Sequence, residues 1–144
     1  MKLFTIGFTK KTAEQFFTRL QKAGVKRILD VRLNNTSQLA AFAKAADLTY
    51  FLQAITGIEY LHVPEFAPTQ EVLDAFKKDK GSWANYEKGF AALLKDRRIA
   101  ESAQAMIRDR DCLLCSEPTP EHCHRGLLAE HIQKHMDNVE VIHL

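Results

Sequence analysis

The chain has 144 residues, of which 46% are hydrophobic and 26% charged, as in ordinary soluble globular domains. A formal charge of +2 is too small to indicate a polyanion partner, and no stretch approaches the roughly 18 apolar residues of a membrane span. No signal peptide opens the sequence, and three cysteines cannot all pair with one another. We therefore predict one domain over residues 1–144, located in the cytoplasm and without a membrane partner.

Strand-like and helix-like patterns alternate along the whole chain. Short apolar runs between turn residues predict strands at residues 2–6, 27–31, 58–63, 112–115 and 139–142. Apolar residues at helical spacing predict helices within residues 12–24, 39–43, 48–56, 72–76, 82–94, 99–107 and 124–135. This alternation is typical of the α/β class, so we expect a single domain with a mainly parallel sheet sandwiched between helices.

Capping residues predict several of the helix ends. Thr12 and Gln15 have the form of a capping box, in which each residue bonds the backbone N–H of the other. Asp47 and Ser82 are expected to cap the helices that follow them, because their side chains accept from free N–H groups. Gly24 is expected to end the first helix.

Polar residues follow three of the predicted strands, where parallel sheets bind their ligands. These residues are Thr5, Gly7, Asp30, Arg32, Asn34, Cys115 and Glu117. Asp30 and Arg32 suit a binding site, or equally a structural ion pair. Glu117 is a candidate general base, or a residue that caps the adjacent loop. We therefore expect a ligand site at this edge of the sheet.

Cys123, His124 and Arg125 lie where a proline-marked loop enters the last predicted helix. Free N–H groups and the positive end of the helix dipole favour an anion or a thiolate there. Cys123 is thus a candidate nucleophile, or else a small buried thiol that helps the loop to pack. Arg125 is expected to clamp an anion, or to pair with Asp30 or Glu117. His124 is a candidate acid–base group, or a helix-start residue bonded to a carboxylate.

The other two cysteines lie on the strand before this loop. Cys115 can face Cys123 as a second thiol, or can be a buried core residue. Cys112 is structural in our interpretation, because residues three apart on a strand point to opposite faces. Zinc held by cysteines and histidines is conceivable, but no second pair has the spacing of a zinc finger. We predict no metal and no cofactor.

These motifs resemble the domain of unknown function family numbered 488. The resemblance rests on residues 5–7, 30–32, 64–65, 113–117 and 123–125, which occur in the family's order. It implies a small α/β protein with a site at these positions, and it implies no particular reaction. Relatives commonly have a glycine pair and an aromatic residue after the third strand. This chain differs at residues 65–69, so its substrate can differ from theirs.

Three functions fit these residues. The first is an enzyme with a cysteine-centred pocket that acts on an anionic substrate, either phosphate-bearing or nucleic-acid-derived. In it Cys123 is the nucleophile, Arg125 and the helix N–H groups hold the anion, and Glu117 or His124 carries the proton. The second is a non-catalytic module that binds a nucleotide or a nucleic acid. The third is a protein interaction module in which the cysteines are structural.

Overall fold

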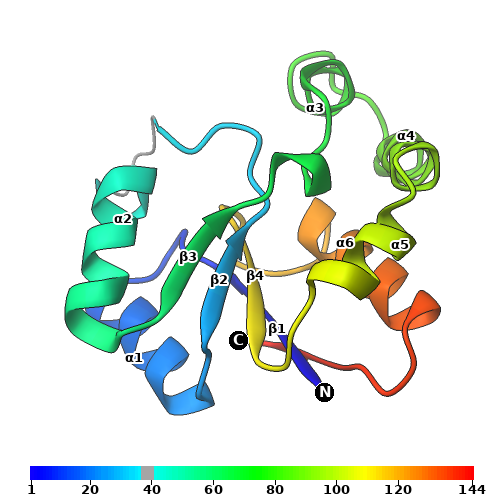
Figure 1. Ribbon diagram of the computed structural model, residues 1–144. Coiled ribbons are helices and arrows are strands. Elements are labelled where there is room, and N and C mark those ends of the chain that lie inside the picture. Colours follow the sequence, from blue (N-terminus) through cyan, green and yellow to red (C-terminus); the bar gives the residue numbers. More distant parts are fainter. Residues whose placement is uncertain (37–40) are drawn as a thin grey trace.

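Five parallel strands form one sheet in the computed structural model, which describes residues 1–36 and 41–144 (Figure 1). In spatial order the strands are β3 (Glu59–His62), β2 (Arg27–Asp30), β4 (Asp111–Cys115), β1 (Lys2–Gly7) and β5 (Glu140–His143). Each neighbouring pair among the described residues is parallel. The predicted α/β class is therefore confirmed, as a single α/β domain.

Helices cover both faces of the sheet (Figure 1). One face carries α1 (Ala13–Ala23), α2 (Ala45–Phe51) and the π-helical turn η2 (Leu52–Thr56). The other face carries α4 (Trp83–Asp96), α5 (Ile99–Met106) and α6 (His124–His135). A short helix, α3 (Gln70–Lys77), packs on α4. No helix in the described part of the chain is long and apolar enough to cross a membrane.

The side chains of the central strand β4 divide between two hydrophobic cores. Cys112 and Leu114 join the core beneath α1 and α2, whereas Leu113 and Cys115 join the core beneath α4, α5 and α6. This alternation follows from the period of two in a strand. It confirms that Cys112 and Cys115 point to opposite faces, so they do not act as a C-x-x-C pair.

Most predicted helix ends are confirmed. Thr12 and Gln15 form the capping box, Ser82 caps α4, and Gly24 ends α1 with a φ of 76°. The prediction for Asp47 is wrong, because α2 begins two residues earlier, and this acidic residue instead lies in the first turn near the positive end of the helix.

The short helix predicted at residues 39–43 is described only in part. Residues 41–43 form a 3-10 turn (Ala41–Ala43), and Leu39 and Ala40 lie outside the described residues. A one-turn 3-10 segment is common in connections between regular elements.

The chain leaves neighbouring strands toward opposite faces of the sheet. After β2 it continues to α2, whose Leu48 lies in one core, and after β4 it continues to α6, whose Leu128 lies in the other. Such a divergence opens a crevice at the carboxyl ends of the strands. The candidate site lies there.

Candidate active site

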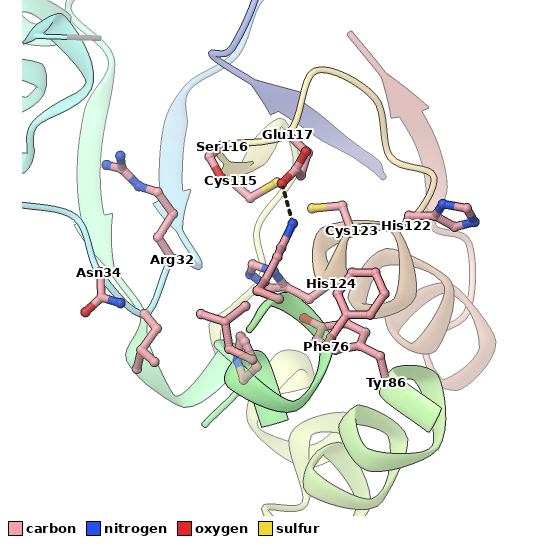
Figure 2. Close-up of a pocket in the computed structure, with 14 residues that line it drawn as sticks. Arg32, Asn34, Phe76, Tyr86, Cys115, Ser116, Glu117, His122, Cys123 and His124 are labelled. Atoms are coloured by element: carbon pink, nitrogen blue, oxygen red, sulfur yellow. Dashed lines mark hydrogen bonds and ion pairs between the residues drawn. The ribbon is translucent and has the colours of Figure 1, made fainter. Parts of the chain in front are cut away.

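A pocket of about 230 Å³ opens beyond the carboxyl ends of β2 and β4 (Figure 2). The loops after both strands line it, together with the start of α6 and parts of α3 and α4. The lining includes six residues predicted from the sequence: Arg32, Asn34, Cys115, Glu117, Cys123 and His124. The expectation that separate strand exits share one site therefore agrees with the geometry.

The other four predicted residues lie behind the pocket and do not line it. Thr5, Asp30 and Arg125 are fully buried, and Gly7 packs against the loop after β4. A Cβ at Gly7 would lie 1.5 Å from the carbonyl oxygen of Glu117. Only glycine allows that backbone approach, so Gly7 fixes where the loop leaves the sheet.

Cys115 and Cys123 form a thiol pair at the floor of the pocket. Figure 2 shows both cysteines bordering the pocket, and the sulfur atoms of both lie within hydrogen-bond reach of the same nitrogen, Nη1 of Arg125. Both cysteines are free thiols, and they are only 1% and 3% exposed. Cys123 is the N-cap of α6, where its side chain caps no backbone group of the helix. Its thiol is therefore available to Cys115.

Arg125 lies against this pair, with its guanidinium fully buried. Its Nη1 is 2.9 Å from Sγ of Cys115, 3.9 Å from Sγ of Cys123 and 2.6 Å from the carbonyl oxygen of Glu117. Its Nε is 3.3 Å from Oγ1 of Thr5. The arginine therefore ties β1, the β4 exit and α6 together around the sulfur atoms.

The predicted pairing of Arg125 with a carboxylate is wrong. The carboxylate of Asp30 binds Arg32, and that of Glu117 binds Nζ of Lys77 at 3.0 Å, at the rim of the pocket (Figure 2). The Asp30–Arg32 pair is the structural alternative stated from the sequence, whereas Lys77 lies 40 residues from Glu117 and was not foreseen.

The negative charge of the thiol pair is favoured on Cys115. Burial raises the pKa of Cys115, but the hydrogen bond from Cys123, the guanidinium of Arg125 and the N–H of Glu117 outweigh it and lower that pKa below the usual value. The pKa of Cys123 is raised, because its proton bonds Cys115 and because it is buried. The helix-start argument from the sequence favoured a thiolate at Cys123, and the geometry favours its neighbour because the guanidinium is nearer.

Asp30 and Arg32 form a buried ion pair. Nε and Nη2 of Arg32 each lie 2.8 Å from a carboxylate oxygen of Asp30, which also accepts from the hydroxyl of Tyr60. Figure 2 shows the guanidinium of Arg32 pointing away from the cysteines. The structural alternative stated for this pair therefore agrees with its geometry, and its predicted contact with a ligand stays a prediction.

His124 is held as a neutral ring. Its Nε2 lies 2.6 Å from the carbonyl oxygen of Val31, to which it donates. Burial lowers the pKa of His124 to about 4. A ring with that pKa does not exchange protons near neutral pH, which argues against the acid–base role. The expected carboxylate partner is also wrong, because the acceptor is a backbone carbonyl.

Acid should destabilise the protein through His124. Its pKa is lower in the folded protein than the usual value near 6.5, so the stabilisation is complete above about pH 6.5 and is lost as pH falls toward 4. We expect the free energy of unfolding to fall by about 3 kcal/mol over that range from this residue. Urea denaturation at several pH values measures it. His124→Gln should flatten the profile, whereas His135→Gln at the exposed end of α6 should change it less, and only through the neighbouring His131 ring.

An aromatic group beside the pocket was missed by the sequence analysis. Phe76 and Tyr86 line the pocket, and Trp83 stacks on Tyr86 and packs on His122. Figure 2 shows the hydroxyl of Tyr86 inside the pocket. Burial raises the pKa of Tyr86, so the hydroxyl is a neutral hydrogen-bond donor. Helical spacing alone made these residues resemble core positions, and only the packing of α3 on α4 brings them to the site.

No group of three or more histidine, cysteine or carboxylate side chains in the described ranges is placed to hold a metal ion. Cys115 and Cys123 have the guanidinium of Arg125 beside them instead. A cation next to two sulfur atoms favours a thiolate without any metal.

The protein is thus a single-domain α/β protein with a parallel sheet, and two thiols and a buried arginine lie at the carboxyl edge of that sheet. The family described as "Domain of unknown function DUF488" matches residues 12–132, and the chain belongs to this family. The match confirms the resemblance drawn from the motifs, and it contains Asp30, Cys115, Cys123 and Arg125. No curated protein and no solved structure gives a match.

Proposed function

We propose that this protein is a thiol-dependent enzyme that acts on a small, negatively charged electrophile, with Cys115 as the nucleophile. One observation carries the proposal: Nη1 of Arg125 lies 2.9 Å from Sγ of Cys115, at the floor of a pocket. The proposal keeps the cysteine-centred pocket predicted from the sequence. It moves the attacking sulfur from Cys123 to Cys115 and makes Cys123 the hydrogen-bond donor.

A thiolate at Cys115 is stabilised by three donors. They are the guanidinium of Arg125, the thiol of Cys123 and the backbone N–H of Glu117. The sulfur is nearly excluded from water, which strengthens each of these interactions. A desolvated, ionised sulfur that borders a pocket is the arrangement of a cysteine nucleophile.

The size and charge of the pocket support a small anionic substrate. About 230 Å³ suits a small molecule better than a polymer. Lys77 lies at the mouth, where it pairs with Glu117, and Arg125 contacts the floor through the sulfur of Cys115. A phosphate-bearing or nucleic-acid-derived molecule would supply the matching charge. Three free thiols also suit the cytoplasm, where cysteines stay reduced.

Alkylation tests the proposal, in a Cys112→Ser background that removes the third thiol. We expect iodoacetamide to label Cys115, with a rate that levels off at lower pH than the rate of free cysteine. In the same background, Cys115→Ser should leave a Cys123 that is labelled more slowly than Cys115, because its sulfur lies 3.9 Å from Nη1 of Arg125 and not 2.9 Å. Peptide mass spectrometry identifies the labelled residue.

The charge of the reagent tests the substrate class. If the pocket prefers anions, the ratio of the alkylation rate with iodoacetate to the rate with iodoacetamide should be larger at Cys115 than at free cysteine. First labelling at Cys123, or a Cys115 profile equal to that of free cysteine, contradicts the proposed nucleophile. If that ratio is no larger at Cys115 than at free cysteine, the anionic substrate is contradicted and the proposed nucleophile is not.

A further inference from the structure

We propose that Cys115 and Cys123 are a two-electron redox pair that reduces a small hydroperoxide and becomes a disulfide in the process. The inference rests on one part of the proposed function, the Cys115 thiolate as nucleophile, and does not require a negative charge on the substrate. It adds the class of substrate and a chemical role for Cys123. Two features of the site support it, namely the arrangement of the two sulfur atoms and the limited access to them.

The two sulfur atoms are placed for direct transfer. Nη1 of Arg125 contacts both sulfur atoms, at 2.9 Å from Cys115 and 3.9 Å from Cys123, so the two thiols lie around one nitrogen. A nucleophile that only forms and releases a covalent adduct needs no second thiol in contact with it. A thiol in that position can attack whatever sulfur adduct forms on Cys115.

The loop between the cysteines holds Cys123 over Cys115. His122 has a φ of 55°, a left-handed conformation that turns the chain back immediately before Cys123. The loop also packs on the first turn of α6, where a Cβ at Gly126 would lie 2.6 Å from the carbonyl oxygen of Pro120. The packed loop therefore keeps the pair together before any substrate arrives.

Access to the sulfur atoms favours a small oxidant. Cys115 and Cys123 are 1% and 3% exposed, so a protein disulfide cannot reach either sulfur without opening the fold. A hydroperoxide transfers a single oxygen atom and leaves no bulky group on the enzyme. The hydroxyl of Tyr86, which lies in the pocket, is a donor for the departing oxygen.

The reaction takes place in two steps on the pair. The Cys115 thiolate attacks the terminal oxygen of the hydroperoxide, the O–O bond breaks, and a sulfenic acid and an alkoxide form. The alkoxide takes a proton and leaves as an alcohol. The Cys123 sulfur then attacks the sulfenic sulfur, a disulfide forms, and the displaced hydroxide leaves as water with the Cys123 proton. The two thiols are oxidised, the peroxide is reduced by two electrons, and a small-molecule dithiol that can enter the pocket must regenerate the pair.

Hydrogen peroxide is the probe, applied to the Cys112→Ser protein. Cys112 is fully buried on the opposite face of the sheet, so its removal leaves the pair intact. We expect one intramolecular disulfide per chain, seen as a mass loss of about 2 Da that dithiothreitol reverses. Cys123→Ser in this background should stop at a sulfenic acid on Cys115, which dimedone traps. Cys115→Ser should react with peroxide at least tenfold more slowly.

The outcomes separate this inference from the proposed function. Rapid alkylation of Cys115 together with peroxide products that stop at sulfinic acid, or with disulfides between chains, would overturn the redox pair and leave the nucleophile standing. A Cys115 that reacts with neither reagent faster than free cysteine would overturn both. A reversible disulfide within one chain, absent from both single-cysteine variants, is the result that the geometry predicts.

Discussion

Gly7→Ala is expected to lower the free energy of unfolding by about 3 kcal/mol, although it adds only one methyl group. The new Cβ would lie 1.5 Å from the carbonyl oxygen of Glu117, 2.6 Å from the carbonyl carbon and 2.9 Å from Nη1 of Arg125. The first two atoms belong to the backbone, so the loop after β4 must move. That movement also breaks the hydrogen bond from Arg125 to the Glu117 carbonyl, and urea denaturation measures the combined loss.

Gly89→Ala is the matched control. Gly89 lies inside α4, where an added Cβ would meet the methyl groups of Val72 at 3.6 Å, an ordinary contact. Alanine is the better helix former, so this variant should gain about 0.5–1 kcal/mol. If Gly7→Ala were as stable as the parent, the close approach of the loop to β1 would not be a requirement of the fold.

Arg125→Met is expected to remove the Cys115 thiolate and to destabilise the fold by about 3 kcal/mol. Methionine keeps much of the length of the side chain but donates no hydrogen bond, so the Glu117 carbonyl and the Cys115 sulfur lose their shared donor. Burial raises the pKa of Cys115 and the guanidinium lowers it, so the pKa should be higher when the guanidinium is removed. Alkylation of Cys115 at pH 7 should then slow at least tenfold.

The pH dependence of stability tests the same residue independently. The pKa of Cys115 is lowered in the folded protein, so its thiolate stabilises the fold fully above the unfolded pKa near 8.5, and the effect is lost as pH falls through the folded pKa. The stability difference between parent and Arg125→Met should therefore be larger at alkaline pH than at acid pH. A difference independent of pH would mean that Arg125 supports the loop without stabilising a thiolate.

Two further variants complete this comparison. Arg125→Lys keeps the charge but loses the planar fork, so it should restore part of the alkylation rate and less of the stability. Arg19→Met, on the exposed side of α1, should change the stability by less than about 0.5 kcal/mol.

The fold was largely predictable because its signals are local. Alternation of apolar runs with helical spacing gave the strands, the helices and the parallel class. The strand order β3-β2-β4-β1-β5 was not predictable from the same signals, because β4 inserts between β1 and β2 only through long-range packing. The start of α2 was misplaced since Asp47 suits both an N-cap and a first turn.

The candidate site was predictable where strand exits define it and not where tertiary packing does. Cys115 and Arg32 share a pocket because parallel strands end at one edge. Phe76 and Tyr86 reach it only through the packing of α3 and α4, which no local pattern records. The distribution of charge between the two thiols depends on their distances to Nη1 of Arg125, 2.9 Å for Cys115 and 3.9 Å for Cys123. No sequence pattern predicts a difference that small.

The contact between Arg125 and Thr5 spans 120 positions of the chain and has a consequence for synthesis of the protein. β1 is synthesised before α6, which carries the arginine. Until both have emerged and docked, the guanidinium has no fixed place and Cys115 is an ordinary thiol. A chain that lacks α6 would therefore not show the reactivity proposed for Cys115, which requires that α6 has docked on β1.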